Sequence, residues 1–250
     1  MSAERRGLRR REALGLLGGG VGAVLLGGPP RLAVARAASV ASASACVSLT
    51  PEVTEGPYYI VNEITRRDVT DGQKGLPLRL RLRVEQLDTC APIAGANVEI
   101  WQANALGVYS GYAATPTPSS GGSGGGGAGG PGHVDPDNSL RYLRGHQVAD
   151  GDGRVVFDTI YPGWYTGRAP HIHVKVHVGG SVVHTGQLFF PDTLSDAVYR
   201  TADYVAHGQP TTTDAEDSIY HQEGGQSAIL ALSRLAGGGY AGAMTMIVRR

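Results

Sequence analysis

The chain has 250 residues, of which 41% are hydrophobic, with 22 basic and 22 acidic residues. Residues 1–37 contain seven Arg and two Glu, so the remaining chain has 15 basic and 20 acidic residues and a net charge of −5. About 210 residues suffice for one domain with a sizeable core. The negative charge gives no support for binding to nucleic acid or to an anionic membrane.

The N-terminus has the pattern of a secretory signal peptide. Arg10 and Arg11 precede an apolar, glycine-rich stretch at residues 14–28, and small-residue cleavage patterns follow up to Ala37. This order predicts a cleaved signal peptide at residues 1–37, and the paired arginines indicate the twin-arginine route. The alternative is a membrane-spanning anchor, for which the apolar stretch is too short and too rich in glycine. We therefore expect a secreted protein without a stable membrane anchor, whose mature form begins near residues 36–39.

Cys46 and Cys90 are the two cysteines of the chain. In a cytosolic protein they would be interpreted as buried thiols. In an exported protein an even pair favours a disulfide bond, although the sequence does not show whether the two Cα atoms come close enough. Such a bond would connect an N-terminal arm, residues 38–75, to the start of the strand expected at residues 96–102.

The rest of the chain, residues 76–250, is expected to form an all-β domain. Apolar and charged residues alternate over residues 78–85, which predicts a half-buried strand whose arginines face solvent. Further strands are predicted at residues 97–101, 154–160, 171–178, 181–190 and 243–248. Many short strands with glycine-rich turns, including a hairpin turn at Gly179 and Gly180, favour an antiparallel β-sandwich. Helix is scarce and is expected only at residues 194–206 and 228–235.

Residues 115–132 are of low complexity, with Pro, Ser and a run of Gly. Such a composition buries too little apolar surface to order itself, which predicts a flexible loop. The loop follows Tyr109 closely, so we expect it at the mouth of a site that contains this residue.

Four residues suggest a metal site. His171 and His173 are two apart in a predicted strand, so both imidazoles point to one face and can reach one ion. Tyr165 precedes this pair by six residues, and Tyr109 follows the strand predicted at residues 97–101. Two phenolates and two imidazoles form a hard, anionic ligand set, which suits a trivalent ion such as Fe(III).

Five segments occur in an order that is typical of one enzyme family. They are Thr54-Glu-Gly-Pro-Tyr-Tyr59, the run from Gly95 to Tyr109, Leu143-Arg-Gly-His-Gln147 with Thr159-Ile-Tyr-Pro-Gly-Trp-Tyr165, Arg168-Ala-Pro-His-Ile-His173 and Gly186-Gln-Leu-Phe-Phe190. Together they resemble the intradiol ring-cleavage dioxygenases, the non-haem Fe(III) enzymes that open catechols. The variant Pro-Gly-x-Tyr-Thr-Gly-Arg is most similar to the exported, single-domain branch of the family. Ala169 and Pro170 are exchanged relative to the family's Arg-Pro-Ala-His-x-His.

The resemblance implies an intradiol β-sandwich and a set of residue roles. It implies one Fe(III) per chain, held by Tyr109, Tyr165, His171 and His173. Tyr165 would leave the iron to accept a proton from the substrate, and Arg168 would stabilise negative charge on the ring. Gln187 and Arg168 would line the substrate side, which Pro57 and Tyr58 would border. A catechol would then react with O2 and open between its hydroxyl-bearing carbons to a cis,cis-muconate.

The resemblance leaves the preferred catechol and the choice between monomer and homodimer open. Because Arg168 lies in a polar turn, we expect it to act on the substrate rather than on folding.

Two other functions are compatible with parts of the pattern. A copper or zinc protein could use His171 and His173 together with His177 or His146. A secreted, non-catalytic β-sandwich could bind a phenol or a sugar through aromatic side chains, for which the candidates are Trp101, Trp164 and Tyr165.

Overall fold

The computed structural model describes residues 46, 48–61, 64–113 and 133–250. The expected signal peptide, residues 1–37, and the expected flexible loop, residues 115–132, lie outside these residues. Among the described residues, no helix is both long enough and apolar enough to span a bilayer.

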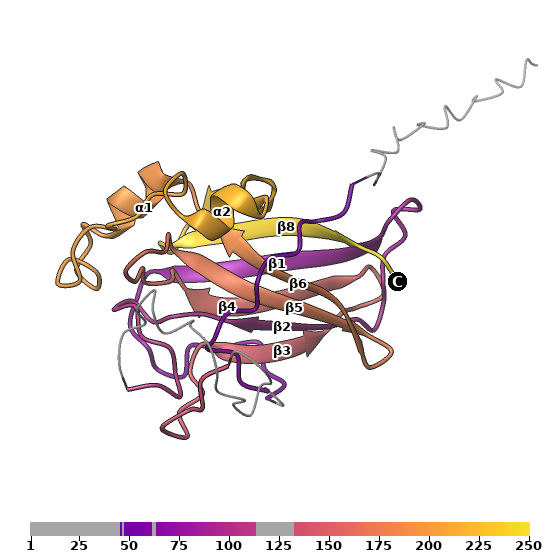
Figure 1. The fold of residues 1–250 in the computed structure, drawn as a ribbon, viewed down its shortest axis with the longest axis horizontal. Helices are drawn as coiled ribbons and strands as arrows, with labels where there is room; N and C mark the ends of the chain where they lie inside the picture. Colours follow the sequence, from indigo (N-terminus) through magenta and orange to yellow (C-terminus); the bar gives the residue numbers. More distant parts are fainter. Residues whose placement is uncertain (1–45, 47, 62–63, 114–132) are drawn as a thin grey trace, which may run out of the picture. The chain divides into compact units, whose positions relative to one another are not determined.

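Two four-stranded sheets form the domain (Figure 1). One sheet has the order β4-β1-β8-β7, and its strands are Arg154–Ile160, Pro77–Gln86, Tyr240–Val248 and Ala231–Arg234. The other has the order β3-β2-β5-β6, and its strands are Arg144–Val148, Asn97–Trp101, His171–Val178 and Ser181–Phe189. The domain is therefore mostly β-structure with little helix, as the sequence predicts.

The main hydrophobic core contains apolar residues from both sheets. In β1 the leucines at positions 78, 80 and 82 are buried, and Arg81 between them is exposed. In β5, Ile172, Val174 and Val176 belong to the same core. The intervening residues of β5 point to the opposite face of the sheet, because side chains alternate along a strand. His171, His173 and Lys175 on that face are buried as well, since the segment before β1 covers it.

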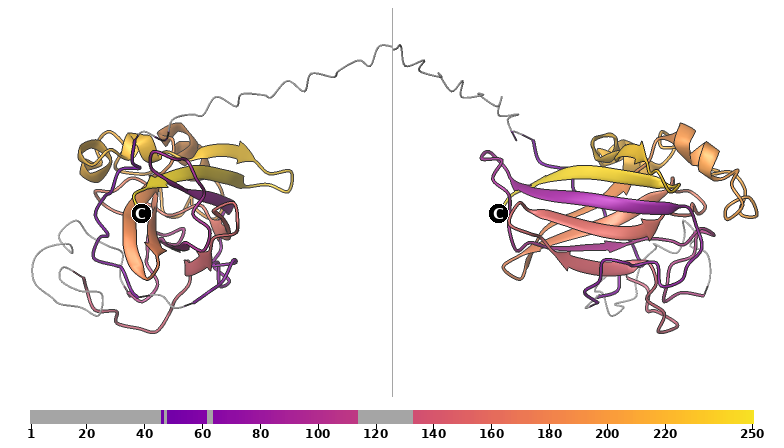
Figure 2. Two further views of the ribbon diagram at one scale, coloured as in Figure 1. Left: turned by 90° about the vertical axis from the view of Figure 1, so that its right-hand side faces the viewer. Right: turned by 180° about the vertical axis from the view of Figure 1, so that it is seen from behind.

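The expectation of a purely antiparallel sandwich is wrong at one pair of strands. β1 and β8 lie side by side and run parallel, with Leu78 opposite Tyr240 and Gln86 opposite Val248 (Figures 1 and 2). The other paired strands are antiparallel. Alternation of apolar residues determines which face of a strand is buried but does not specify its direction, so this pairing was not predictable from the pattern.

The helices differ from those expected. α1 covers only Asp192–Val198, the first part of the predicted helix at residues 194–206. The helix predicted at residues 228–235 is absent. A short 3-10 helix, η2, covers Gly225–Ala228, and the strand β7, Ala231–Arg234, occupies most of the remaining segment. A helix that the sequence pattern did not indicate, α2 at Ser218–Gln222, lies near α1 outside the sheets (Figure 1).

The segment before β1 covers the outer face of the sheet that contains β5. The backbone N–H of Thr50 donates a hydrogen bond to the Ile247 carbonyl oxygen at 2.9 Å, and that of Val53 donates to the Thr185 carbonyl oxygen at 3.1 Å. Farther along, Tyr58, Tyr59 and other aromatic residues form a second hydrophobic cluster on this face: Tyr58, Tyr59, Ile60, Trp101, Ala103, Tyr109, Tyr112 and Tyr165. The outer face of β5 is thus an enclosed surface rather than a solvated one.

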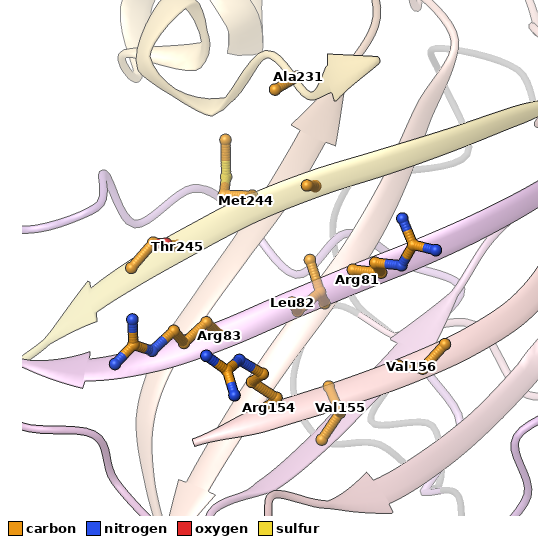
Figure 3. Close-up of a pocket in the computed structure, with 10 residues that line it drawn as sticks. Arg81, Leu82, Arg83, Arg154, Val155, Val156, Ala231, Met244 and Thr245 are labelled. Atoms are coloured by element: carbon orange, nitrogen blue, oxygen red, sulfur yellow. The ribbon is translucent and has the colours of Figure 1, made fainter. Parts of the chain in front are cut away.

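An open groove of about 400 Å³ lies on the other sheet, over β4, β1 and β8 (Figure 3). Arg81, Arg83 and Arg154 project beside it, and none of the four predicted metal ligands lines it. Arg83 pairs with Glu85 at 3.0 Å, and Arg79 on the same strand pairs with Asp158 at 2.7 Å. These contacts are consistent with the solvated strand face that the alternating pattern predicts.

A disulfide bond joins Cys46 to Cys90, whose Cα atoms are 5.4 Å apart. Cys90 lies between β1 and β2, so the bond fastens the start of the described chain to the sandwich. Glu85 lies close to the two sulfur atoms. Because the sulfurs are bonded to each other, these residues do not form a thiolate metal site.

We expect the disulfide to stabilise the domain. It closes a loop of 44 residues, for which the chain-entropy relation gives about 4 kcal/mol as an upper figure. Denaturant unfolding of the wild type with and without reductant measures this loss of free energy of unfolding, and the Cys46→Ser/Cys90→Ser variant should match the reduced wild type. Two freely alkylated thiols in the oxidised, purified protein would contradict the pairing.

Candidate metal centre

The four predicted ligands converge in the structure. Nε2 of His171 lies 3.3 Å from the Tyr109 hydroxyl, 3.2 Å from the Tyr165 hydroxyl and 3.2 Å from Nε2 of His173. All four side chains are at most 6% exposed. Zinc binds nitrogen at about 2.0–2.1 Å, and at such a distance ligand atoms at neighbouring positions around a metal ion are roughly 2.8–3.4 Å apart. The observed separations therefore fit the edges of a metal coordination sphere.

Two loops that pack closely together deliver the tyrosines. Tyr109 follows β2, and Tyr165 follows β4. Between them, Gly163 donates a backbone hydrogen bond to the Asn104 carbonyl oxygen at 3.0 Å. A Cβ atom on Gly163 would lie 2.1 Å from that oxygen, so only glycine permits this approach. The contact sets the position of one tyrosine-bearing loop against the other.

The orientation of His171 is fixed by its own backbone neighbourhood. Nδ1 lies 2.7 Å from the Ala169 carbonyl oxygen, which can only accept a hydrogen bond. Nδ1 therefore carries the proton, and Nε2 presents its lone pair to the cluster. His173 stacks on Trp101, with ring centroids 4.7 Å apart and planes at 7°. Gly56 also lies close to the His173 ring, because a Cβ atom at this position would be 3.3 Å from Cε1.

The protonation states suit a highly charged cation. Burial lowers the pKa of His171 and of His173 well below the usual value, so both imidazoles are neutral and able to bind a metal. Burial raises the pKa of Tyr165, and burial together with Tyr165 raises the pKa of Tyr109 well above its usual value. Two buried phenolates need a strong positive charge between them, which a trivalent ion would supply. The donor set therefore fits ferric iron.

Arg168 lies beside the cluster and also has a carboxylate partner, a structural contact that the sequence pattern did not indicate. Its Nη1 is 3.4 Å from the Tyr165 hydroxyl, while Nε donates to both oxygens of Asp217 at 2.9 and 3.1 Å. Asp217 is fully buried and also accepts from the backbone N–H of Ala169 at 2.9 Å. It caps α2 as well, so one carboxylate connects the helix, Arg168 and the segment that leads to His171.

The other residues expected on the substrate side lie next to the cluster. Gln187 is opposite His173 in the pairing of β5 and β6, and its side chain bonds to Arg168 and, at 2.9 Å, to the Thr54 carbonyl oxygen. Tyr58 stacks on Tyr109 with centroids 5.2 Å apart. Pro57 accepts a backbone hydrogen bond from Val134 at 2.9 Å. The structure thus brings these residues together around the same four side chains.

The sequence interpretation missed two buried charged residues near the cluster. Asp217 precedes α2, where an Asp at the helix start is a common cap, but nothing in the sequence connects it to Arg168. Arg144 begins β3 within one of the segments that carry the resemblance, but no local pattern gives the residue itself a role. Its alignment with Trp101 across the strands is visible only once the strand pairing is known.

The structure does not favour the two alternative functions. Nε2 of His177 lies 3.7 Å from a Glu99 carboxylate oxygen, and Nε2 of His146 lies 2.6 Å from the Thr65 hydroxyl. Neither Nε2 atom is therefore directed at His171 and His173. Trp101 is 1% exposed and cannot serve as a sugar-binding surface. Tyr165 is also buried.

Comparisons with known proteins agree with this geometry. No family model matches the chain. Among solved structures, an intradiol ring-cleavage dioxygenase from Tetranychus urticae is 32% identical, with 81% of this chain and 94% of that chain covered and a TM-score of 0.72. The dioxygenase domain of a dioxygenase–carbohydrate-binding protein fusion from Streptomyces sp. SirexAA-E is 27% identical, covering 81% and 99%, with a TM-score of 0.56.

A more distant similarity concerns the fold alone. The 3-chlorocatechol 1,2-dioxygenase from Rhodococcus opacus 1CP is 18% identical, covering 82% of this chain and 74% of that chain, with a TM-score of 0.53. The match at 32% identity spans nearly the whole of the Tetranychus urticae enzyme. This chain therefore belongs to the intradiol ring-cleavage dioxygenases.

Proposed function

We propose that this protein is a secreted non-haem Fe(III) dioxygenase that uses O2 to cleave a catechol between its two hydroxyl-bearing carbons. The observation that carries the proposal is the convergence of two phenol oxygens and two imidazole nitrogens on one buried point, with separations of 3.2 and 3.3 Å from His171. The product would be a cis,cis-muconate, and one iron ion would bind per chain.

Tyr109, Tyr165, His171 and His173 would hold the iron. When bound, ferric iron supplies the Lewis acidity that makes a catecholate ring reactive toward O2. The two histidines are held by contacts outside the cluster, namely the Ala169 carbonyl oxygen and the Trp101 ring. Such outer contacts orient the donor atoms, so the site is arranged before the ion arrives.

Tyr165 is the tyrosine suited to exchange a proton with the substrate. Its hydroxyl lies within reach of the Arg168 guanidinium at 3.4 Å, whereas Tyr109 is 0% exposed and stacks against Tyr58. A catechol that binds in place of Tyr165 would lose two protons, of which the Tyr165 oxygen can accept one and a solvent hydroxide the other. Arg168 can then donate a hydrogen bond to this tyrosine while it is displaced.

Arg168 would also stabilise negative charge on the ring. Asp217 and Gln187 fix its guanidinium by bonds at Nε and Nη2, so its charge is oriented before the substrate binds. A preorganised charge of this kind lowers the barrier without reorganisation during the reaction. Pro57 and Tyr58 would border the substrate.

Export is part of the proposal and rests on the N-terminal pattern together with the disulfide. A disulfide between Cys46 and Cys90 is typical of a protein that folds or resides outside the reducing cytosol. N-terminal sequencing of the protein recovered from the culture medium tests this part. A start near residues 36–39 is expected, and retention of the protein in the cytosol with residues 1–37 intact would contradict it.

The iron assignment is tested by the colour of the protein. Ferric phenolate absorbs visible light strongly, so the purified wild type should be coloured and contain about one iron per chain. Tyr109→Phe should remove most of the colour and most of the O2 uptake with catechol, because it removes a ligand oxygen. Tyr112→Phe is the matched control, since the hydroxyl of this nearby tyrosine donates to the Val134 carbonyl oxygen and Tyr112 is not one of the four predicted ligands. A colourless wild type that consumes O2 would overturn the iron assignment.

The two roles of Arg168 are separable with a double variant. Arg168→Gln leaves Asp217 buried without its partner, and loss of one member of a buried pair costs about 3–5 kcal/mol of stability. It should also lower kcat by about 100-fold or more through loss of the oriented charge. Adding Asp217→Asn removes the unpaired carboxylate and keeps a residue suited to cap α2, so thermal stability should partly recover.

The turnover of this double variant decides the role. If Arg168 acts on the substrate, kcat stays low in Arg168→Gln/Asp217→Asn even though stability recovers. Recovery of kcat to the wild-type value, together with stability, would mean that Arg168 contributes only to folding. Iron content, measured on the same samples, separates loss of metal from loss of the charge.

A further inference from the structure

Arg144 is a buried cation without a carboxylate partner. The side chain is 1% exposed, and no ion pair of Arg144 is present among the described residues. Nη1 has no hydrogen-bond partner in this part of the chain. A guanidinium keeps its positive charge at neutral pH. A buried charge is costly unless an opposite charge compensates it.

The strand register places Arg144 in line with the candidate metal centre. Arg144 on β3 is opposite Trp101 on β2, and Trp101 is opposite His173 on β5. Directly opposite residues share a face of the sheet, so all three lie on the enclosed outer face. Trp101 lies between Arg144 and His173 in this strand register, and its ring stacks on the His173 ring.

Arg144 contacts the loop that carries Tyr109 in two ways. Nε and Nη2 donate to the hydroxyl and the carbonyl oxygen of Ser110 at 2.9 and 3.0 Å, which holds the residue directly after Tyr109. The guanidinium carbon also lies over the Tyr109 ring, 5.8 Å from its centroid, within the range of a cation–π contact.

The other acidic groups around Arg144 are engaged or neutral. Tyr112, Tyr109 and Glu99 are the groups of opposite potential charge that act on it most strongly. Glu99 accepts from the Tyr59 hydroxyl at 3.2 Å and lies 3.7 Å from His177. Tyr112 donates its hydroxyl proton to the Val134 carbonyl oxygen. Tyr109 differs from Glu99 because its ring lies directly against the guanidinium, so a phenolate there would place negative charge in contact with Arg144.

We propose that Arg144 is a positioning residue whose positive charge balances the phenolate of Tyr109 and tunes its donation to the metal. The inference rests on the proposed ferric site. The visible absorption transfers an electron from a filled phenolate orbital to the iron. A cation next to the phenolate ring lowers the energy of that filled orbital. Arg144 thus keeps this absorption at shorter wavelength and makes the iron easier to reduce than it would be without the charge.

Two variants of Arg144 separate charge from hydrogen bonding. Arg144→Lys keeps the charge, and Arg144→Gln removes it, while both retain an N–H donor for Ser110. In iron-loaded protein, Arg144→Gln should move the visible absorption band to longer wavelength and lower the reduction potential in a spectroelectrochemical titration. Arg144→Lys should stay near the wild type in both measurements. Equal shifts in both variants, or an unchanged band in Arg144→Gln with one iron bound, would overturn the proposal.

A substitution on the other side of the contact keeps the proposal testable if Arg144→Gln does not fold. Ser110→Asp retains the guanidinium but adds a carboxylate beside it, so it should shift the band to longer wavelength as well. Ser110→Ala, which removes both hydrogen bonds of the hydroxyl, to Arg144 and to the Tyr142 carbonyl oxygen, but leaves the charge, is its control and should not shift the band. A wild type that binds no iron would refute the proposed function instead, so the two failures are distinguishable.

Discussion

The structure depends on one constraint, which is that both faces of β5 are buried for different reasons. One face contributes Ile172, Val174 and Val176 to the core between the sheets. The other carries His171 and His173 into a second, aromatic and polar layer. Because side chains alternate strictly along a strand, a shift of one residue in register would move the histidines into the hydrophobic core. Core packing therefore determines the direction of the imidazoles.

Charge is arranged around the cluster in two distinct ways. Arg168 is neutralised within the protein by Asp217, so it can be held near the cluster without adding net charge. Arg144 has no such carboxylate in the described residues and contacts the loop that bears Tyr109 instead. One cation is thus compensated by the fold, and the other would be balanced by the phenolate of Tyr109 in the proposed ferric site. The two arginines illustrate that proximity to a site does not by itself define how a charge acts there.

The sequence was sufficient for the elements with strong local patterns. The bounds of β2, β4 and β5 agree with the predicted ranges, and the cluster of Tyr109, Tyr165, His171 and His173 forms as the spacing and the resemblance suggested. β3 and β7 were missed because they are short and lack clear alternation. The pairing of Arg168 with Asp217 spans 49 residues, and no local pattern encodes such a contact. The parallel pairing of β1 and β8 is equally non-local.

The contacts of the arm before β1 also constrain the order in which parts of the chain can fold. Thr50 exchanges hydrogen bonds with Ile247, 197 residues later, and the Thr54 carbonyl oxygen holds Gln187, 133 residues later. Contacts of such long sequence separation require the closure of long loops, which slows their formation relative to local contacts. The arm is synthesised before β6 and β8, yet it can take its place only after both strands exist. The chain must therefore be synthesised through β8 before the arm can make all of these contacts.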